Sequence, residues 1–167
     1  MNILKASMKK TEYKIVVFGD SASGKSALVK RFINNEFRQT YDPTIEDKYK
    51  TKFNFQNQPI NLQIVDTSGK ELMPGMLSRY IAYADAFIVC YSIGSRKSFL
   101  RAFHLFELIS QKRQISEIAR VLVGCKCDSE YREVYAEEGN DLSAQLQCSF
   151  AETSAAQNLN VIEVKLG

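Results

Sequence analysis

Apolar runs separated by polar segments give this chain the pattern of a protein in which strands and helices alternate. A strand buried on both faces of a sheet has a nearly continuous apolar run. Such runs, with a shorter one near the carboxyl end of the chain, predict four strands, over residues 13–18, 86–91, 121–124 and 148–151. They indicate a sheet whose centre is covered on both sides.

Two further segments, residues 49–55 and 60–65, instead alternate between polar and apolar positions. Alternation with a period of two is typical of a half-exposed strand. Asn57-Gln58 lies between the two segments as a plausible hairpin turn. These strands are therefore expected to be antiparallel neighbours, with one of them at an edge of the sheet.

Helices are expected between most of these strands, because apolar residues there recur at helical spacing. In the segment from Lys25 to about Asn34 the spaced residues are Leu28, Val29, Phe32 and Ile33. Other helices are expected from about Met76 to Ala82, after a Ser95 cap to about Lys112, from Ala136 to Gln147, and from near Asn158 or Leu159. We expect loops at Phe37–Asp47 and, as a mobile segment, at Asp66–Gly75.

This order of elements predicts an α/β fold. The expected architecture is a six-stranded, mostly parallel sheet with one antiparallel edge strand and helices on both faces. In such sheets ligands bind at the carboxyl ends of the strands. Polar residues directly after the buried strands are therefore the first candidates for a site.

Length and composition set limits on the type of protein. The 167 residues suit one domain with a sizeable core, expected over residues 12–167 after a disordered lead-in at residues 1–11. A net charge of +3 on dispersed basic residues argues against a nucleic-acid partner. The cysteines lie in or beside apolar runs without a CxxC pair, so we expect buried free thiols at Cys90, Cys125, Cys127 and Cys148. No apolar run approaches the ~18 residues of a membrane span, and we expect a cytoplasmic protein.

The most informative stretch is Gly19-Asp20-Ser21-Ala22-Ser23-Gly24-Lys25-Ser26, which connects the first predicted strand to the first predicted helix. A glycine-flanked loop followed by Lys-Ser at a helix start is the phosphate-binding P-loop, whose amides and lysine hold phosphates. The serine hydroxyl can bind Mg²⁺. The predicted phosphate contacts are Gly19, Asp20, Ser21, Ala22, Ser23, Gly24, Lys25, Ser26 and Ala27.

Three more strand ends carry candidate chemistry. Asp66-Thr67-Ser68-Gly69 offers a carboxylate for a water-mediated Mg²⁺ contact and a glycine amide for a γ-phosphate. Cys125-Lys126-Cys127-Asp128 offers a carboxylate that can accept from the N1–H and 2-amino group of guanine, with the Lys126 stem along the base. Glu152-Thr153-Ser154-Ala155 offers a backbone amide for the guanine O6. Asp128 disfavours an ATPase or kinase, because adenine lacks that pair of donors.

With these motifs the chain resembles a Ras-family small GTPase over nearly its whole length. The most specific match is Tyr41–Tyr49, similar to the switch I and effector segment of the Ras and Rap branch, with Lys48 in place of a small polar residue. The resemblance implies GTP or GDP as ligand, with Mg²⁺ held by Ser26 and Thr44 and by Asp66 through water. It implies that Phe37 stacks on guanine and that the nucleotide contacts include Tyr41, Pro43, Thr44, Gly69, Ser154, Ala155 and Ala156.

Two departures from the family pattern concern hydrolysis. By the resemblance, the catalytic positions are Lys25, Thr44, Gly69 and Lys70, and Lys70 replaces a glutamine that orients the attacking water. An ammonium group only donates hydrogen bonds, so it cannot accept one from that water. Ser21 replaces a glycine close to where the arginine of a GTPase-activating protein would enter. We therefore predict slow intrinsic hydrolysis and a weak response to such proteins.

Two other departures concern the base. Cys125 replaces an asparagine that can bond both base and P-loop, and Ala156 replaces a lysine. Each lost partner costs about 1–3 kcal/mol, so weaker binding and faster nucleotide exchange are expected. The alternative is a pseudo-GTPase, which binds partners without turnover.

The resemblance also implies partners. Effector domains of the Ras-binding type are expected to dock through Tyr41–Tyr49, and exchange factors and GTPase-activating proteins are further expected partners of a monomer. The last helix is expected to be short, and there is no C-a-a-X box. Membrane association is thus not encoded here; a lipidated tail missing from this chain would put the protein on the cytosolic face of a membrane.

Overall fold

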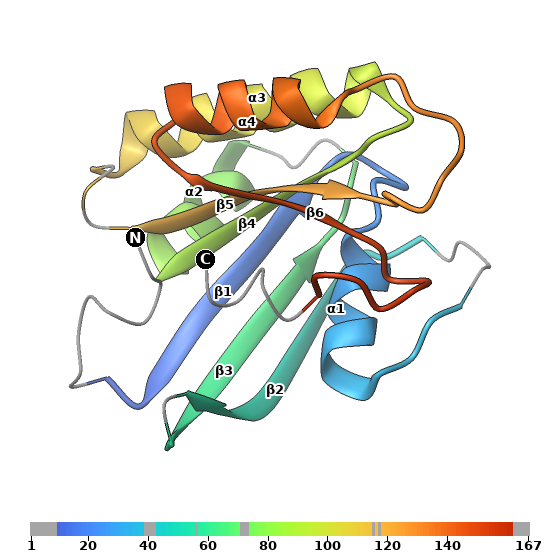
Figure 1. Ribbon diagram of the computed structural model, residues 1–167. Helices are drawn as coiled ribbons and strands as arrows, with labels where there is room; N and C mark the ends of the chain where they lie inside the picture. The colour runs from blue at the N-terminus through green and yellow to red at the C-terminus, as the bar shows by residue number, and fades with distance from the viewer. Residues whose placement is uncertain are drawn as a thin grey trace.

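A six-stranded sheet forms the centre of the protein (Figure 1). The computed structural model describes residues 10–38, 43–55, 57–70, 74–114, 116 and 118–161. The strand order is β2-β3-β1-β4-β5-β6. The strands are β1 (Glu12–Gly19), β2 (Glu46–Phe55), β3 (Gln58–Thr67), β4 (Ala86–Ser92), β5 (Ala119–Cys125) and β6 (Ser149–Thr153). The pairing of β2 with β3 is antiparallel and all other pairings are parallel, which confirms the predicted sheet.

The β2–β3 hairpin is longer than its alternating pattern indicated. Its ladder continues to the pair Glu46 and Thr67, so Asp66 belongs to a strand and not to a loop. The sequence obscures this extension, because Asp47 and Lys48 are adjacent polar residues that break the alternation. The consequence is functional: a ladder fixes Asp66 at the carboxyl end of β3.

The helices are α1 (Lys25–Asn34), α2 (Pro74–Tyr83), α3 (Arg96–Lys112) and α4 (Ala136–Gln145). As predicted, Ser95 caps α3 by accepting from the Ser98 N–H at 3.2 Å. Apolar residues of α2, α3 and α4 join one core cluster, while those of α1 join the cluster on the other face of the sheet. In Figure 1, α3 and α4 lie above the sheet and α1 lies on the opposite side. Both faces therefore carry helices, as expected.

The expectation of a helix beginning near Asn158 or Leu159 is wrong. Leu159 forms an isolated bridge with Ser154, with N–H···O distances of 2.9 and 3.1 Å. Asn158 and Asn160 both have a φ of +56°, a left-handed conformation that asparagine tolerates and that a right-handed helix excludes. Residues 162–167, where a later helix start would fall, lie outside the described residues.

The four cysteines are free thiols, as predicted. Cys90 and Cys125 are buried, but Cys127 and Cys148 are only partly buried, because both lie just outside strands in connecting segments. Among the helices of the described segments, none combines the length and the hydropathy that crossing a membrane requires.

Candidate functional site

A cavity of about 460 Å³ opens at the carboxyl ends of the parallel strands. Thr67 at the end of β3 and Cys125 at the end of β5 line it, together with the first two turns of α1. Predicted nucleotide contacts that line the cavity are Ala22, Gly24, Lys25, Ser26, Ala27, Phe37, Thr44, Gly69, Cys125, Lys126, Asp128, Ala155 and Ala156. The tertiary structure thus brings residues of five chain segments to one place.

Two glycines shape the loop between β1 and α1. Gly19 has a φ of +148°, and a Cβ there would lie 2.3 Å from the Cys90 carbonyl oxygen. Gly24, the residue before α1, has a φ of +108°, and a Cβ there would lie 2.7 Å from the Cys125 Cβ. Both backbone conformation and space therefore require glycine at these positions. The loop is held tightly against the ends of β4 and β5.

Lys25 begins α1 and its side chain is almost wholly buried beneath the loop. Its Nζ donates to the Asp20 carbonyl oxygen at 2.7 Å. Burial lowers the pKa of Lys25, an effect opposed by nearby groups that include the Asp66 carboxylate. A desolvated ammonium group with spare donors is a strong local attraction for anionic oxygens.

Two hydroxyl groups, of Ser26 and Thr44, line the cavity, and the Asp66 carboxyl group, which does not line it, lies close to Ser26. The Ser26 Oγ and Thr44 Oγ1 are 2.9 Å apart. Asp66 is wholly buried, and within the described residues neither carboxylate oxygen has a hydrogen-bond partner. Burial raises the pKa of this carboxyl group, whereas Ser26 and Lys25 counteract that rise. A buried carboxylate without partners beside two hydroxyls is a donor set that suits Mg²⁺, which prefers oxygen ligands.

Gly69 comes into very close contact with the P-loop. A Cβ on Gly69 would lie 2.3 Å from the Ser21 backbone nitrogen, so only glycine fits. The next residue, Lys70, is exposed, and its N–H donates to the Ser68 Oγ at 3.2 Å. Lys70 lines a smaller neighbouring cavity with Arg101 and not the main one. The structure therefore brings Gly69 and Ser21 together but leaves the Lys70 side chain beside the main cavity.

The loop after β5 is joined directly to the P-loop. The Lys126 Nζ donates to the Ala22 carbonyl oxygen at 2.8 Å. The Cys127 N–H donates to the Thr153 carbonyl oxygen at 3.0 Å, which connects this loop to the end of β6. Asp128 is exposed at the cavity wall. A carboxylate in that position can accept hydrogen bonds from a planar ligand that enters the cavity.

The segment after β6 is held by a residue that the sequence did not indicate. Arg31, on α1, donates from Nε to the Ala155 carbonyl oxygen at 2.6 Å and from Nη2 to that of Ala156 at 3.3 Å. Its guanidinium carbon also lies 5.9 Å from the centre of the Phe37 ring. Arg31 thus connects two parts of the cavity wall that are more than a hundred residues apart in the chain.

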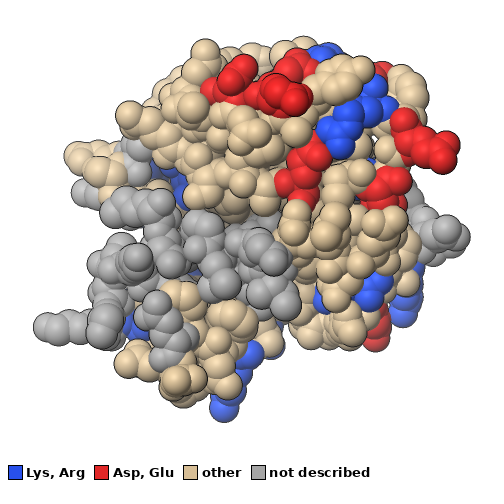
Figure 2. All heavy atoms as spheres, viewed as in Figure 1, with Lys and Arg blue, Asp and Glu red and all other residues tan. Residues whose placement is uncertain are grey.

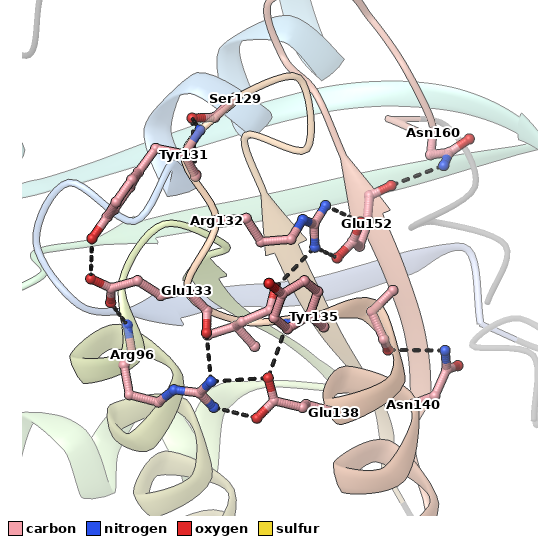
Figure 3. Close-up of polar contacts among 12 residues, drawn as sticks. Arg96, Ser129, Tyr131, Arg132, Glu133, Tyr135, Glu138, Asn140, Glu152 and Asn160 are labelled. Carbon is pink, nitrogen blue, oxygen red and sulfur yellow. Dashed lines mark hydrogen bonds and ion pairs between the residues drawn. The ribbon is translucent and has the colours of Figure 1, made fainter.

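A network of charged side chains supports the same wall from behind (Figure 3). Arg132, on the loop after β5, forms two hydrogen bonds with the Glu152 carboxylate at 2.6 and 2.9 Å and one with the Val134 carbonyl oxygen. Glu152 lies on β6 directly before Thr153. Farther out, the Arg96 guanidinium pairs with Glu138 and donates to the Glu133 carbonyl oxygen, and the Arg96 N–H donates to the Glu133 carboxylate. The loop after β5, which lines the cavity with Lys126 and Asp128, is therefore joined to β6 by a bidentate ion pair.

Some predicted contacts lie elsewhere. Gly19, Asp20, Ser21, Ser23, Pro43, Asp66 and Ser154 do not line the cavity, and Tyr41 lies outside the described residues. The Ser154 side chain is buried and accepts from the Gln157 N–H, so it faces its own turn. Residues that line the cavity without having been predicted are Leu28, Lys30, Glu36, Arg38, Thr67 and Ser129. Adjacency to Phe37 and Asp128 is the one signal that could have indicated Glu36, Arg38 and Ser129.

Comparison with known proteins agrees with this geometry. Residues 14–165 match the model of the Ras family. GTP-binding protein Rit2 of Mus musculus is 44% identical over 151 residues, which are 90% of this chain and 70% of that protein. GTP-binding protein Di-Ras1 of Homo sapiens is 40% identical over 154 residues, 92% of this chain and 78% of that protein. Ras-like protein 2 of Mucor circinelloides is 40% identical over 151 residues, which are 90% of this chain and 76% of that protein.

Proposed function

The chain belongs to the Ras family of small GTPases, which are GTP-binding switches, and on that premise we propose that it is a switch that hydrolyses GTP slowly. The observation that carries the proposal is Lys70, which directly follows the glycine packed against Ser21. Without a glutamine there, GTP would persist and the active state would last longer. Those residues of the site that keep the family pattern would hold the nucleotide.

The phosphates would lie on the P-loop, with Lys25 as the cation that contacts them. Mg²⁺ would be held by the Ser26 and Thr44 hydroxyls, with Asp66 acting through water. This assignment is supported by the buried, unpartnered Asp66 carboxylate and by the 2.9 Å separation of the two hydroxyls. Bound Mg²⁺ would neutralise charge on the phosphate oxygens. The Gly69 amide is well placed for a γ-phosphate because the glycine packs directly on the P-loop.

Guanine would be selected by Asp128, which can accept from its N1–H and its 2-amino group. The Lys126 stem would lie along one face of the ring, and Phe37 would contact it from the side of α1. All three residues line the same cavity, which supports this arrangement. The Ala155 amide is the candidate donor to the guanine O6, since Arg31 fixes that segment.

Hydrolysis would be slow for two reasons. Lys70 cannot accept a hydrogen bond from the attacking water, and losing one preorganised catalytic contact costs roughly 10²–10³-fold in rate. The Ser21 backbone lies against Gly69, so the serine side chain adds bulk where the arginine of a GTPase-activating protein would enter. Such an arginine accelerates GTP hydrolysis about 10³–10⁵-fold, and we expect most of that acceleration to be absent.

Partners follow from the same assignment. Effector domains would bind the segment Tyr41–Tyr49 and the edge of β2, and exchange factors would act on a cytoplasmic, monomeric protein. The second candidate function is a pseudo-GTPase that binds partners without turnover. Cys125 and Ala156 favour it, because both replace polar partners that hold the nucleotide in the family pattern.

Nucleotide content separates the two candidates. Protein purified in Mg²⁺ buffer, heated to release ligand and analysed by chromatography, should yield nearly one GDP or GTP per chain. Release of no guanine nucleotide, together with no binding in a titration at micromolar protein, would favour the pseudo-GTPase.

Single-turnover hydrolysis tests the rate. GTP-loaded protein should hydrolyse far more slowly than Lys70→Gln, which should gain roughly 10²–10³-fold. Lys112→Gln, on the exposed end of α3, is the matched control and should leave the rate unchanged. Equal rates for the unsubstituted protein and Lys70→Gln would refute the role given to Lys70.

A further inference from the structure

We infer that the outer face of β2 recognises an acidic strand, in which every second residue is Asp or Glu. The inference rests on the proposed function only in treating β2 as an effector-binding edge. It names the chemical class of the partner, which the proposed function leaves open. The observations that carry it are a row of lysines, the contacts of Glu46, and the charges of the neighbouring strands.

β2 lies at the end of the strand order and pairs with β3 along one edge. Within the described residues no strand pairs with its other edge. The N–H and C=O groups of that edge can therefore bond to an added strand, which is one general mode of peptide recognition. At ten residues, β2 is long enough to hold several side-chain pairs of a partner.

Three lysines lie at alternate positions of this strand: Lys48, Lys50 and Lys52 are all exposed. Tyr49 and Phe53, on the opposite face, pack against the core cluster that includes α1. Side chains two residues apart in a strand lie on one face, roughly 6–7 Å from each other. The outer face of β2 is thus a row of evenly spaced ammonium groups, and in Figure 2 basic side chains lie at the lower end of the molecule, over the β2–β3 hairpin.

The carboxylate nearest the row is neutralised within the protein. Glu46 pairs with Lys48 at 2.8 Å and also accepts a hydrogen bond from the Tyr80 hydroxyl. A basic partner would have to compete with both contacts. On this face the amino-terminal end of β2 is therefore close to neutral, and the positive charge of the row lies on the two lysines that follow. The exposed Asp47 lies on the other face of the strand, where it accepts from the Tyr49 hydroxyl at 3.4 Å.

Lys50 and Lys52 have no carboxylate within ion-pair distance in the part of the chain that the structure describes. Their cross-strand neighbours on β3 are the uncharged residues Gln63 and Asn61. Gln63 in turn donates to Glu12 at 2.6 Å and accepts from the Tyr83 hydroxyl at 2.7 Å. Apart from Glu46, the acidic residue that these contacts bring nearest on this face is Glu12, which lies two strands away on β1 and accepts from Gln63.

This distribution favours an added strand over a membrane surface. The cations form one line beside a free strand edge, and the adjoining strand on the same face is uncharged. A strand added at about 4.8 Å would place its alternate side chains next to Lys50 and Lys52, and oppositely charged neighbours across strands stabilise the pairing. Its other side chains would lie beside Thr51 and Phe53, where apolar residues fit.

The experiment uses the full chain with ¹⁵N label and three capped eight-residue peptides. In the first, four glutamates alternate with four valines. The second has the same residues in two blocks, and in the third lysine replaces glutamate. The alternating acidic peptide should bind and shift the backbone amides of residues 46–55. The block isomer and the basic peptide should bind at least about tenfold more weakly, because neither can place two acids beside the lysines.

Variants then test the row itself. The Lys50→Glu/Lys52→Glu double variant should weaken binding of the alternating peptide about tenfold or more, since two ion pairs become two repulsions. Lys97→Glu/Lys112→Glu, with the same charge change on exposed sites of α3, should change it less than about twofold. Amide spectra of both variants report directly whether each is folded.

Several outcomes would overturn the inference. Equal binding of the block isomer, or an equal effect of the α3 variant, would mean charge attraction without strand pairing. Absence of peptide binding would mean that the lysines only protect the edge from aggregation. Binding to phosphatidylserine vesicles that depends on Lys50 and Lys52, without peptide binding, would assign the row to a membrane. None of these readouts needs bound nucleotide, so failure here is distinguishable from failure of the GTPase assignment.

Discussion

The end of the cavity that we assign to the phosphates and the end that we assign to the base are built in different ways; they are called the phosphate end and the base end below. At the phosphate end, glycines hold the backbone in close contact with neighbouring strands, and Lys25 and Asp66 are buried. At the base end, Lys126 and Asp128 are exposed, and their loop is fixed by side-chain contacts such as Arg132 with Glu152. One end depends on backbone geometry and the other on a side-chain network.

This difference explains two of the departures from the family pattern, Cys125 and Ala156, whereas Ser21 and Lys70 lie near the other end of the cavity. A substitution at Gly24 or Gly69 would create overlaps below 3 Å and distort the whole loop. A substitution such as Cys125 or Ala156 removes a single polar partner and costs only about 1–3 kcal/mol. Residues at the base end can therefore be substituted without loss of the fold. Such substitutions should alter the affinity for nucleotide and the rate of nucleotide exchange.

The largest effect is expected at the phosphate end. Lys25→Met removes a buried cation whose hydrogen bonds to phosphate are charge-assisted, so affinity for GDP should fall about a hundredfold or more. Isothermal titration measures the change, and Lys112→Met on the exposed end of α3 serves as control. If Lys25→Met bound GDP as tightly as the unsubstituted protein, the P-loop would not be the phosphate site.

A gain of affinity is expected at the base end. Cys125→Asn with Ala156→Lys restores two polar partners and should slow GDP dissociation roughly tenfold to a hundredfold. The release of a fluorescent GDP analogue measures the rate. Each single variant should account for part of the gain, whereas unchanged dissociation in a folded double variant would show that the base end does not limit retention.

A smaller loss of GDP binding is expected from a change in the ion pair between Arg132 and Glu152. Arg132→Met leaves the Glu152 carboxylate unpaired and loosens the loop that carries Asp128, so GDP should dissociate about tenfold faster. The preference for GDP over inosine diphosphate, which lacks the 2-amino group, should fall as well. A purely structural role would lower thermal stability without changing that preference.

The matched control for Arg132 is Arg96→Met, which breaks the outer ion pair of the same network with Glu138 (Figure 3). Because that pair is farther from the cavity, its loss should affect stability and leave base preference unchanged. An equal loss of base preference in both variants would mean that the network acts as one unit.

The smallest effect is a pH dependence of stability. Hydrogen bonds from Arg96 and from the Tyr135 N–H lower the pKa of Glu138 from 4.5 to about 2. A depressed pKa contributes stability above the unfolded value, and that contribution is lost as pH falls from about 4.5 toward 2. The melting temperature of Glu138→Gln should be slightly below that of the unsubstituted protein at pH 7, and the difference should disappear near pH 2.

The sequence by itself determined the fold class, the antiparallel hairpin and the glycine-flanked loop before Lys25. Those features depend on local signals, namely apolar periodicity and glycines at fixed spacing before Lys25. The helix expected near Leu159 failed because periodicity over so short a segment cannot outweigh asparagines in left-handed conformations.

Only the tertiary structure decided which distant side chains meet. Arg31 reaches Ala155, Arg132 pairs with Glu152, and Glu46 is held by Lys48 and Tyr80. Most of these contacts join residues far apart in the chain, and each depends on how helices and loops pack on the sheet. A charged residue in a sequence looks the same whether its partner is water or a buried carboxylate, and packing alone distinguishes the two.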